Sequence, residues 1–149
     1  LVLLFVLLVA GGITWKIFGS KVEMLITPTT EVTYTVRIKG TYPRYYDALT
    51  ANEFPQQLAA GDALIADAFL IGAESVPNVS QVMTADGRIV DAEDSAKIDI
   101  ICTVKAKVTN ADILKVGPQE IRVGKDYFVK TKVFDMIGNI ESLTLEDQK

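Results

Sequence analysis

The first ten residues contain no polar side chain, and the first charge in the chain is Lys16. A helix that is apolar on every side has to be buried in lipid or in protein, so this segment constrains the chain more than any other. We predict a hydrophobic helix over residues 1–20, which ends at Gly19 and Ser20. The residues expected to contact lipid or neighbouring apolar helices are Leu1, Leu4, Phe5, Leu8, Gly11, Gly12, Trp15 and Lys16.

The length of this segment leaves three interpretations open. Residues 1–18 would form a helix of roughly 27 Å at about 1.5 Å per residue, against a hydrocarbon core of about 30 Å. The segment is then a transmembrane anchor preceded by further residues, a processed helix in the centre of a pilus-like filament, or a secretory signal peptide. Phe5 stands where bacterial pilins carry a glutamate. The expected location is a membrane with an extracytoplasmic domain, or an extracellular filament.

The composition of the rest of the chain disfavours several classes of partner and active site. The 149 residues suffice for one domain plus the helix. Beyond residue 20 the chain has 14 Lys and Arg against 19 Asp and Glu, a net charge of −5, which disfavours nucleic acid as a partner. It has no His, the commonest general base and metal ligand, and one Cys, so an intrachain disulfide cannot form.

Residues 31–39 alternate strictly between apolar and polar side chains, as expected of a half-buried strand. Residues 97–108 form the longest strand candidate, and Ala85-Asp86-Gly87 predicts a hairpin turn. A short helix is expected after Pro43, and a turn is expected over residues 135–139 before a last strand.

These patterns give six to eight short strands without a βαβ rhythm. The predicted fold class is mainly β, or α+β when the N-terminal helix is counted. In this prediction the hydrophobic helix precedes a small antiparallel or mixed β-sandwich or barrel. We assign residues 1–20 to the helix, 21–30 to a linker and 31–149 to the β-rich domain.

The order of several short motifs resembles a known family. These motifs are Val9-Ala-Gly-Gly-Ile13, Val36-Arg-Ile-Lys-Gly40, Gly61-Asp62, Thr84-Ala-Asp-Gly-Arg-Ile-Val90, Val123-Gly-Lys125 and Val129-Lys-Thr-Lys132. In this order they are similar to the bacterial membrane-anchored proteins of the domain of unknown function 4330 family. The resemblance implies an N-terminal anchor and an extracytoplasmic β domain in the cell envelope. It implies no site residues.

Three groups of residues are candidates for chemistry or contact. Acidic residues crowd the connection before the longest strand, where a solvated loop is the plain interpretation and a calcium site the alternative; they are Asp91, Glu93, Asp94 and Asp99. Cys102 lies on the apolar face of its strand and is interpreted as a core residue. An aromatic and basic group packs the short helix onto the sheet or contacts another subunit or a glycan; it consists of Tyr42, Arg44, Tyr45 and Tyr46.

Asn78-Val79-Ser80 also fits the glycosylation sequon. The sequence gives no catalytic, cofactor-binding or metal-binding residue that we can assign. We therefore expect a non-enzymatic structural or interaction protein, a homo-oligomer that self-assembles through its N-terminal helix as a pilus-like filament subunit with the β domain outward. The alternative is a single-span anchored extracytoplasmic domain that binds an envelope partner.

Overall fold

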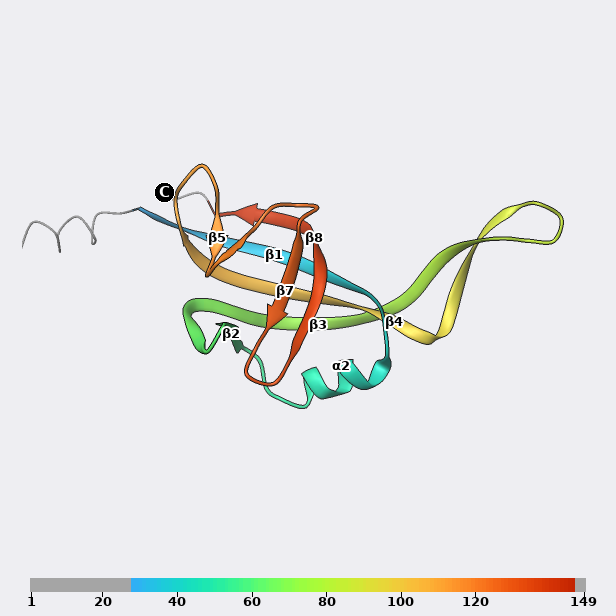
Figure 1. Cartoon of the computed structure of the whole chain (residues 1–149), viewed down its shortest axis with the longest axis horizontal. Coiled ribbons are helices and arrows are strands. Elements are labelled where there is room, and N and C mark those ends of the chain that lie inside the picture. Colours follow the sequence, from blue (N-terminus) through green and yellow to red (C-terminus); the bar gives the residue numbers. More distant parts are fainter. Residues whose placement is uncertain (1–27, 147–149) are drawn as a thin grey trace, which may run out of the picture.

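The computed structural model describes residues 28–146, which form one curled antiparallel sheet, a separate pair of short strands and one short helix (Figure 1). The elements in chain order are β1 (Thr29–Thr41), α2 (Pro43–Thr50), β2 (Gln56–Ala60), β3 (Ala63–Met83), β4 (Ile89–Thr109), β5 (Lys115–Val116), β6 (Gln119–Glu120), β7 (Asp126–Lys130) and β8 (Asp135–Leu145). The strand order in the main sheet is β2-β3-β4-β1-β8-β7, and β5 pairs with β6 alone.

The centre of the sheet confirms the two strands that alternation predicts most clearly. β1 pairs with β4 along most of its length, with Val36 opposite Cys102. The apolar faces of both strands point into the barrel, where their side chains are buried together with Leu70, Val129 and Ile140 of the neighbouring strands. A period of two places alternate residues on opposite faces of a sheet, so each of these strands supplies one wall of the core.

The two ends of the sheet come together and nearly close it into a barrel. β2 and β7 are the outer strands, and Leu58 forms an antiparallel bridge with Thr131. α2 begins at Pro43, which needs no helical N–H at that position, and it buries Leu49 in the core. This bridge covers part of the edge that an open sheet would present.

The predicted fold class is wrong as a whole, although its mainly β part agrees with the structure. The described chain is mainly β and entirely antiparallel in its pairings, and one curled sheet encloses the core where a sandwich would have two layers. Within residues 28–146 the only helix is the eight-residue α2. The expected helix over residues 1–20, with Leu1, Leu4, Phe5, Leu8, Gly11, Gly12, Trp15 and Lys16, lies outside the described residues.

The predicted location also needs correction. Over residues 28–146 no helix has the length and apolar character required to cross a membrane. The assignment to a cell membrane with an extracytoplasmic domain, or to an extracellular filament, is therefore not supported.

The turn expected over residues 135–139 is wrong as well, because these residues belong to β8. The chain turns earlier, where Thr131 donates its backbone N–H to the carbonyl of Phe134 at 2.7 Å. Gly138 marks a close approach of strands: a Cβ added there would lie 2.7 Å from the carbonyl oxygen of Arg37. A glycine within a strand pattern indicates such a contact as readily as a turn.

Candidate functional site

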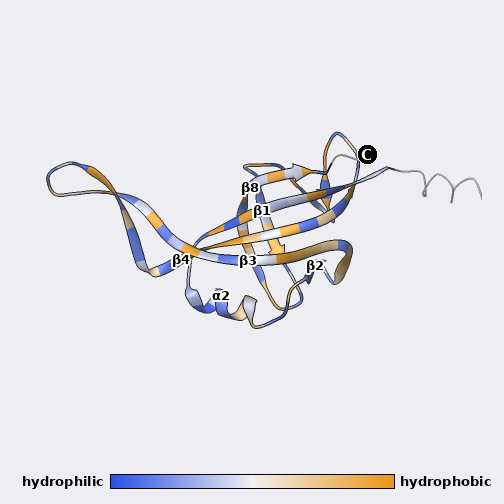
Figure 2. Ribbon diagram, turned by 180° about the vertical axis from the view of Figure 1, so that it is seen from behind, coloured by the Kyte–Doolittle hydropathy of each residue, from blue (hydrophilic) through white to orange (hydrophobic). Residues whose placement is uncertain are grey.

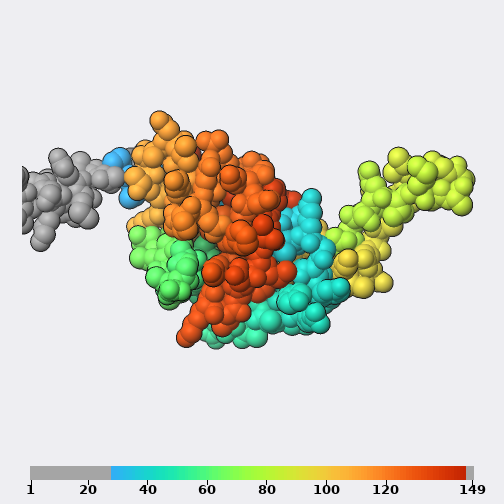
Figure 3. Space-filling model, viewed as in Figure 1, coloured from blue at the N-terminus to red at the C-terminus, as the bar shows by residue number. Residues whose placement is uncertain are grey.

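The outer parts of β3 and β4 leave the barrel and form a projecting hairpin, which we call the arm and define as residues 79–96 (Figures 1 and 3). No residue of the arm is buried. β4 has 21 residues, which at about 3.3 Å per residue corresponds to roughly 70 Å. Residues 97–109 of this strand lie in the barrel wall, and residues 89–96 belong to the arm. The arm and the chain's entry into β1 lie at opposite ends of the barrel (Figure 1).

The tip of the arm is the turn that the Asp-Gly pair predicts, and the structure confirms it. Thr84 donates its backbone N–H to the carbonyl of Arg88 at 2.8 Å, and Gly87 donates to Thr84 at 2.9 Å. Gly87 has a φ of 83°, a conformation that costs glycine little and other residues more. Asp86 and Arg88 form an exposed ion pair at 2.8 Å.

Large apolar side chains lie exposed on both strands next to this turn. Met83 has 73% of its surface exposed and its cross-strand partner Ile89 has 66%. Val82 and Val90 form the adjacent pair, and Val79 lies further toward the barrel. Figure 2 shows apolar stretches along the arm, well away from the barrel core. A two-stranded ribbon has no interior, so folding of the single chain leaves these side chains in water.

Charge is divided unevenly between the two strands of the arm. Between Glu74 and Asp86 the chain has no charged residue, so the β3 strand of the arm is neutral. The β4 strand carries Asp91, Glu93 and Asp94, all exposed. Proteins commonly place charges on exposed edge strands to prevent pairing with other chains. The β4 edge has this protection and the β3 edge lacks it.

The acidic residues predicted as one cluster are therefore divided by the structure. Three of them belong to the arm, and they lie on a continuous strand, which the expectation of a loop missed. Asp99 is buried at the base of the arm, where Asn78, Gly40 and Arg37 donate hydrogen bonds to it at 2.8, 2.9 and 3.0 Å. Across residues 28–146 no group of three or more His, Cys, Asp or Glu side chains is placed to hold a metal ion.

The hydrogen bonds that Asp99 accepts lower its pKa by more than its burial raises it. Burial alone would raise the pKa of this carboxyl group, but the donors from Asn78, Gly40 and Arg37 favour the charged form and hold the pKa below its usual value. The Asn78 side chain that would accept a glycan in the sequon is occupied by this bond. This network fixes the point at which the arm leaves the barrel.

The aromatic and basic residues predicted as a contact group lie at the start of α2. Arg44 places its guanidinium carbon 5.1 Å from the ring centre of Tyr42 and 5.0 Å from that of Tyr45. These two tyrosines are 46% and 38% exposed. Tyr46 turns the other way and packs against the core. The structure thus brings three of the four residues together at the surface, within cation–π distance.

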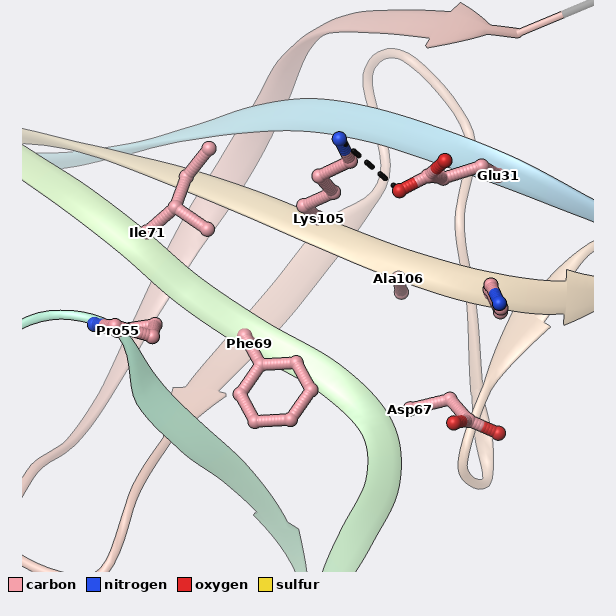
Figure 4. A pocket seen from close by; sticks show the side chains of 8 residues that line it. Glu31, Pro55, Asp67, Phe69, Ile71, Lys105 and Ala106 are labelled. Atoms are coloured by element: carbon pink, nitrogen blue, oxygen red, sulfur yellow. Dashed lines mark ion pairs between the residues drawn. The ribbon is translucent and has the colours of Figure 1, made fainter.

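A shallow depression of about 320 Å³ lies on the outer face of β3, β4 and β1 (Figure 4). Phe69 and Ile71 supply its apolar floor. Lys105 also lines the depression. Its ammonium group forms an ion pair with Glu31 at 3.0 Å, which neutralises its charge. The depression offers an apolar surface with no unpaired buried polar group aimed into it.

Inside the barrel, two groups that could carry chemistry are enclosed. Cys102 is buried, and burial raises the pKa of its thiol to about 12, which agrees with the prediction of a core cysteine. Tyr34 donates its hydroxyl to that of Tyr127 at 2.9 Å, and the two rings meet edge to face at 5.3 Å. Burial raises the pKa of both phenols. These residues stabilise the core.

Comparison with known families identifies the family of this chain. The family described as Domain of unknown function (DUF4330) matches residues 1–144. The chain belongs to this family. The resemblance drawn from the order of motifs is thereby confirmed for the family, while the membrane anchoring that it implied is not supported. No curated protein and no solved structure matches the chain.

The arm is the feature that the sequence prediction missed. Alternation is lost in β3 after Gly72 and in β4 before Lys97, because neither side of a projecting ribbon is buried. A signal was nevertheless present. Eleven residues without charge, 75–85, lead into a strong hairpin turn and are followed by valine and isoleucine. That pattern fits a hairpin that leaves the body of a domain.

Proposed function

We propose that this protein is a non-enzymatic structural protein that works by self-association, with its β domain outward. The observation that carries the proposal is the arm, which exposes Met83, Ile89 and Val79 where the single chain offers them no core. Exposed apolar clusters of this kind mark surfaces that contact other macromolecules.

The position of the arm supports an outward β domain. The chain enters the barrel at Thr29, which pairs with Thr109 at one end of β4, and the arm occupies the other end of that strand. The part of the chain before Thr29, whose sequence includes the apolar run of residues 1–10, is therefore connected to the barrel at the end away from the arm. Burial of these runs against each other in neighbouring copies would leave the arms pointing away from the centre of the assembly.

Sedimentation velocity of the full chain over a concentration series tests this proposal. We expect oligomers whose fraction grows with concentration, and we expect Leu4→Asp with Leu8→Asp to reduce their size, because the two charges would have to be buried in the assembly. The matched control is Leu64→Asp, at an exposed leucine of the barrel surface. A full chain that stays monomeric at every concentration would refute self-association.

A second candidate function is binding of a different protein through the α2 surface. Tyr42, Arg44 and Tyr45 favour it, since tyrosine and arginine are enriched in the energetically dominant parts of protein interfaces. Tyr45→Ala tests this candidate. It should abolish capture of a partner by the full chain while leaving self-association unchanged, whereas loss of self-association would assign this surface to the first function.

A further inference from the structure

We propose that two copies of this protein pair through the β3 edges of their arms, antiparallel and about a two-fold axis at Gln81. The two hairpins then form one four-stranded sheet with a barrel at each end. The inference rests on the proposed self-association and adds to it a second contact between copies, with its own surface, register and symmetry.

The backbone of the β3 edge is free to pair. β2 pairs with β3 only as far as Leu70, and among residues 28–146 no strand lies along β3 from Ile71 to Met83 on its side away from β4. Thr84 bonds inward to Arg88, and inward and outward backbone groups alternate along an antiparallel strand. Val79, Gln81 and Met83 therefore direct their N–H and C=O groups away from β4, toward the side where a further strand would lie.

The side chains of this edge match those of a second copy. In antiparallel pairing centred on Gln81, Val79 of each copy faces Met83 of the other, and the two Gln81 amides face each other. On the same side of the sheet, Ile89 lies beside Met83 and extends the apolar row. An amide carries both donors and an acceptor, so two Gln81 side chains can bond reciprocally across the axis.

Charge selects the β3 edge over the β4 edge. Pairing through β4 would bring the carboxylates of Asp91 and Glu93 against those of the second copy, and like charges directly opposite destabilise a sheet. Pairing through β3 places the two Asp91 residues three strand spacings apart, about 14 Å. This separation exceeds the screening length of about 8 Å at physiological ionic strength. The neutral edge meets its own copy without such repulsion.

The shape of the molecule leaves room for this arrangement. The arm extends beyond the body of the barrel in the space-filling view (Figure 3), so two antiparallel arms can overlap with their barrels at opposite ends. A two-stranded ribbon is marginal in water, and three or more strands with an apolar face are stable. Pairing therefore gives the exposed Met83, Ile89 and Val79 the partners that the single arm lacks.

Charge substitution at the axis tests the proposal. Gln81→Lys and Gln81→Glu, each made in the full chain, would set two like charges about 5 Å apart, and sedimentation equilibrium would measure the dimer Kd. The Kd of the Gln81→Glu variant should rise by about fourfold if the effective dielectric constant is that of water, and by several hundredfold if it is near 20. The Kd of Gln81→Lys should rise by less, because Asp91 lies opposite position 81 on the same face and offsets part of the repulsion. An equal mixture of the two variants should recover the wild-type Kd or better, because opposite charges then meet.

The matched control is Asp91→Lys, on the same face of the arm but on the opposite edge. It should leave the Kd within about twofold of wild type. As a second readout, Gln81→Cys should form an interchain disulfide on oxidation and Asp91→Cys should not, because only the first would place two Cα atoms about 5.5 Å apart, within the range that a disulfide spans. The native Cys102 is buried and does not compete.

Each result has one meaning. Weakening by both single charges, with recovery on mixing, supports the pairing, and a misfolded arm could not give that recovery. Weakening without recovery overturns it. A wild-type Kd in both Gln81 variants overturns this interface while the proposed self-association stands. A full chain that is monomeric throughout removes both proposals.

Discussion

The barrel and the arm are built from the same two strands, yet they satisfy different conditions. In the barrel, β4 buries alternate residues from Ile100 to Val108 against the neighbouring strands. In the arm, the same strand and β3 have only each other, and no side chain from 79 to 96 is buried. The difference shows that hydrogen bonding between two strands is enough to form a ribbon. A buried core forms only where the sheet curls around its apolar face.

The largest contrast should appear when one leucine is shortened in each environment. Leu70→Ala removes a fully buried side chain of β3 and should lower the free energy of unfolding by about 2–5 kcal/mol. Leu64→Ala, on the same strand but 51% exposed, should change it by less than about 0.5 kcal/mol. Urea unfolding of the two variants measures both values. Equal losses would show that the barrel interior does not provide the stability attributed to it.

Asp99, at the junction between the barrel and the arm, should make a contribution to the free energy of unfolding that depends on pH. Asp99→Asn leaves one oxygen where the carboxylate accepts from three donors, so we expect a loss of about 1.5–3 kcal/mol at pH 7. The folded pKa of Asp99 lies below its unfolded value. Its contribution is therefore complete above the unfolded pKa of about 4 and disappears as the pH falls through the folded pKa.

Urea unfolding of wild type and Asp99→Asn across pH 2–7 measures this effect. The difference between the two proteins should shrink as the solution becomes more acidic. A difference that stays constant over this range would mean that shape, and not charge, matters at the junction.

The strands at the barrel centre followed from the sequence, and the arm did not. Alternation in β1 and in residues 98–108 of β4 has a direct physical cause, since one face is buried and the other is wet. Gly138 was misread because glycine serves both turns and close strand contacts, and only the neighbouring Arg37 carbonyl decides between them. The arm escaped prediction because the side chains it exposes can be buried only by another molecule, which is not encoded in local periodicity.

The same reasoning applies to the candidate residues. The cation–π group at Tyr42, Arg44 and Tyr45 could be anticipated because the residues are close in sequence. The separation of Asp99 from the other acids could not, because it depends on Gly40 and Asn78 meeting at the base of the arm. Short-range patterns predict neighbours along the chain, and the network at the junction joins three separate strands.

The buried tyrosine pair allows the energy of one hydrogen bond inside the barrel to be measured. Tyr34→Phe and Tyr127→Phe each leave one buried hydroxyl without its partner and should cost about 1–3 kcal/mol. The double variant should cost less than the sum of the two, by about 1 kcal/mol, because both hydroxyls are then gone. Thermal or urea unfolding of all four proteins completes the cycle. Strict additivity would show that the hydroxyls do not interact.

The smallest effect on stability, and the sharpest separation of the two regions, is expected at Ile89. Ile89→Ala shortens an exposed side chain of the arm, so the free energy of unfolding at low protein concentration should change by less than about 0.5 kcal/mol. Self-association should nevertheless weaken by about fivefold, since the lost methyl groups are worth roughly 1 kcal/mol when a second arm covers them. Ile137→Ala, at an isoleucine of β8 that is 49% exposed, is the control and should alter neither quantity. If Ile89→Ala destabilised the monomer as much as a core truncation, the arm would belong to the cooperative unit of the barrel. Its apolar residues would then be serving the fold and not a partner.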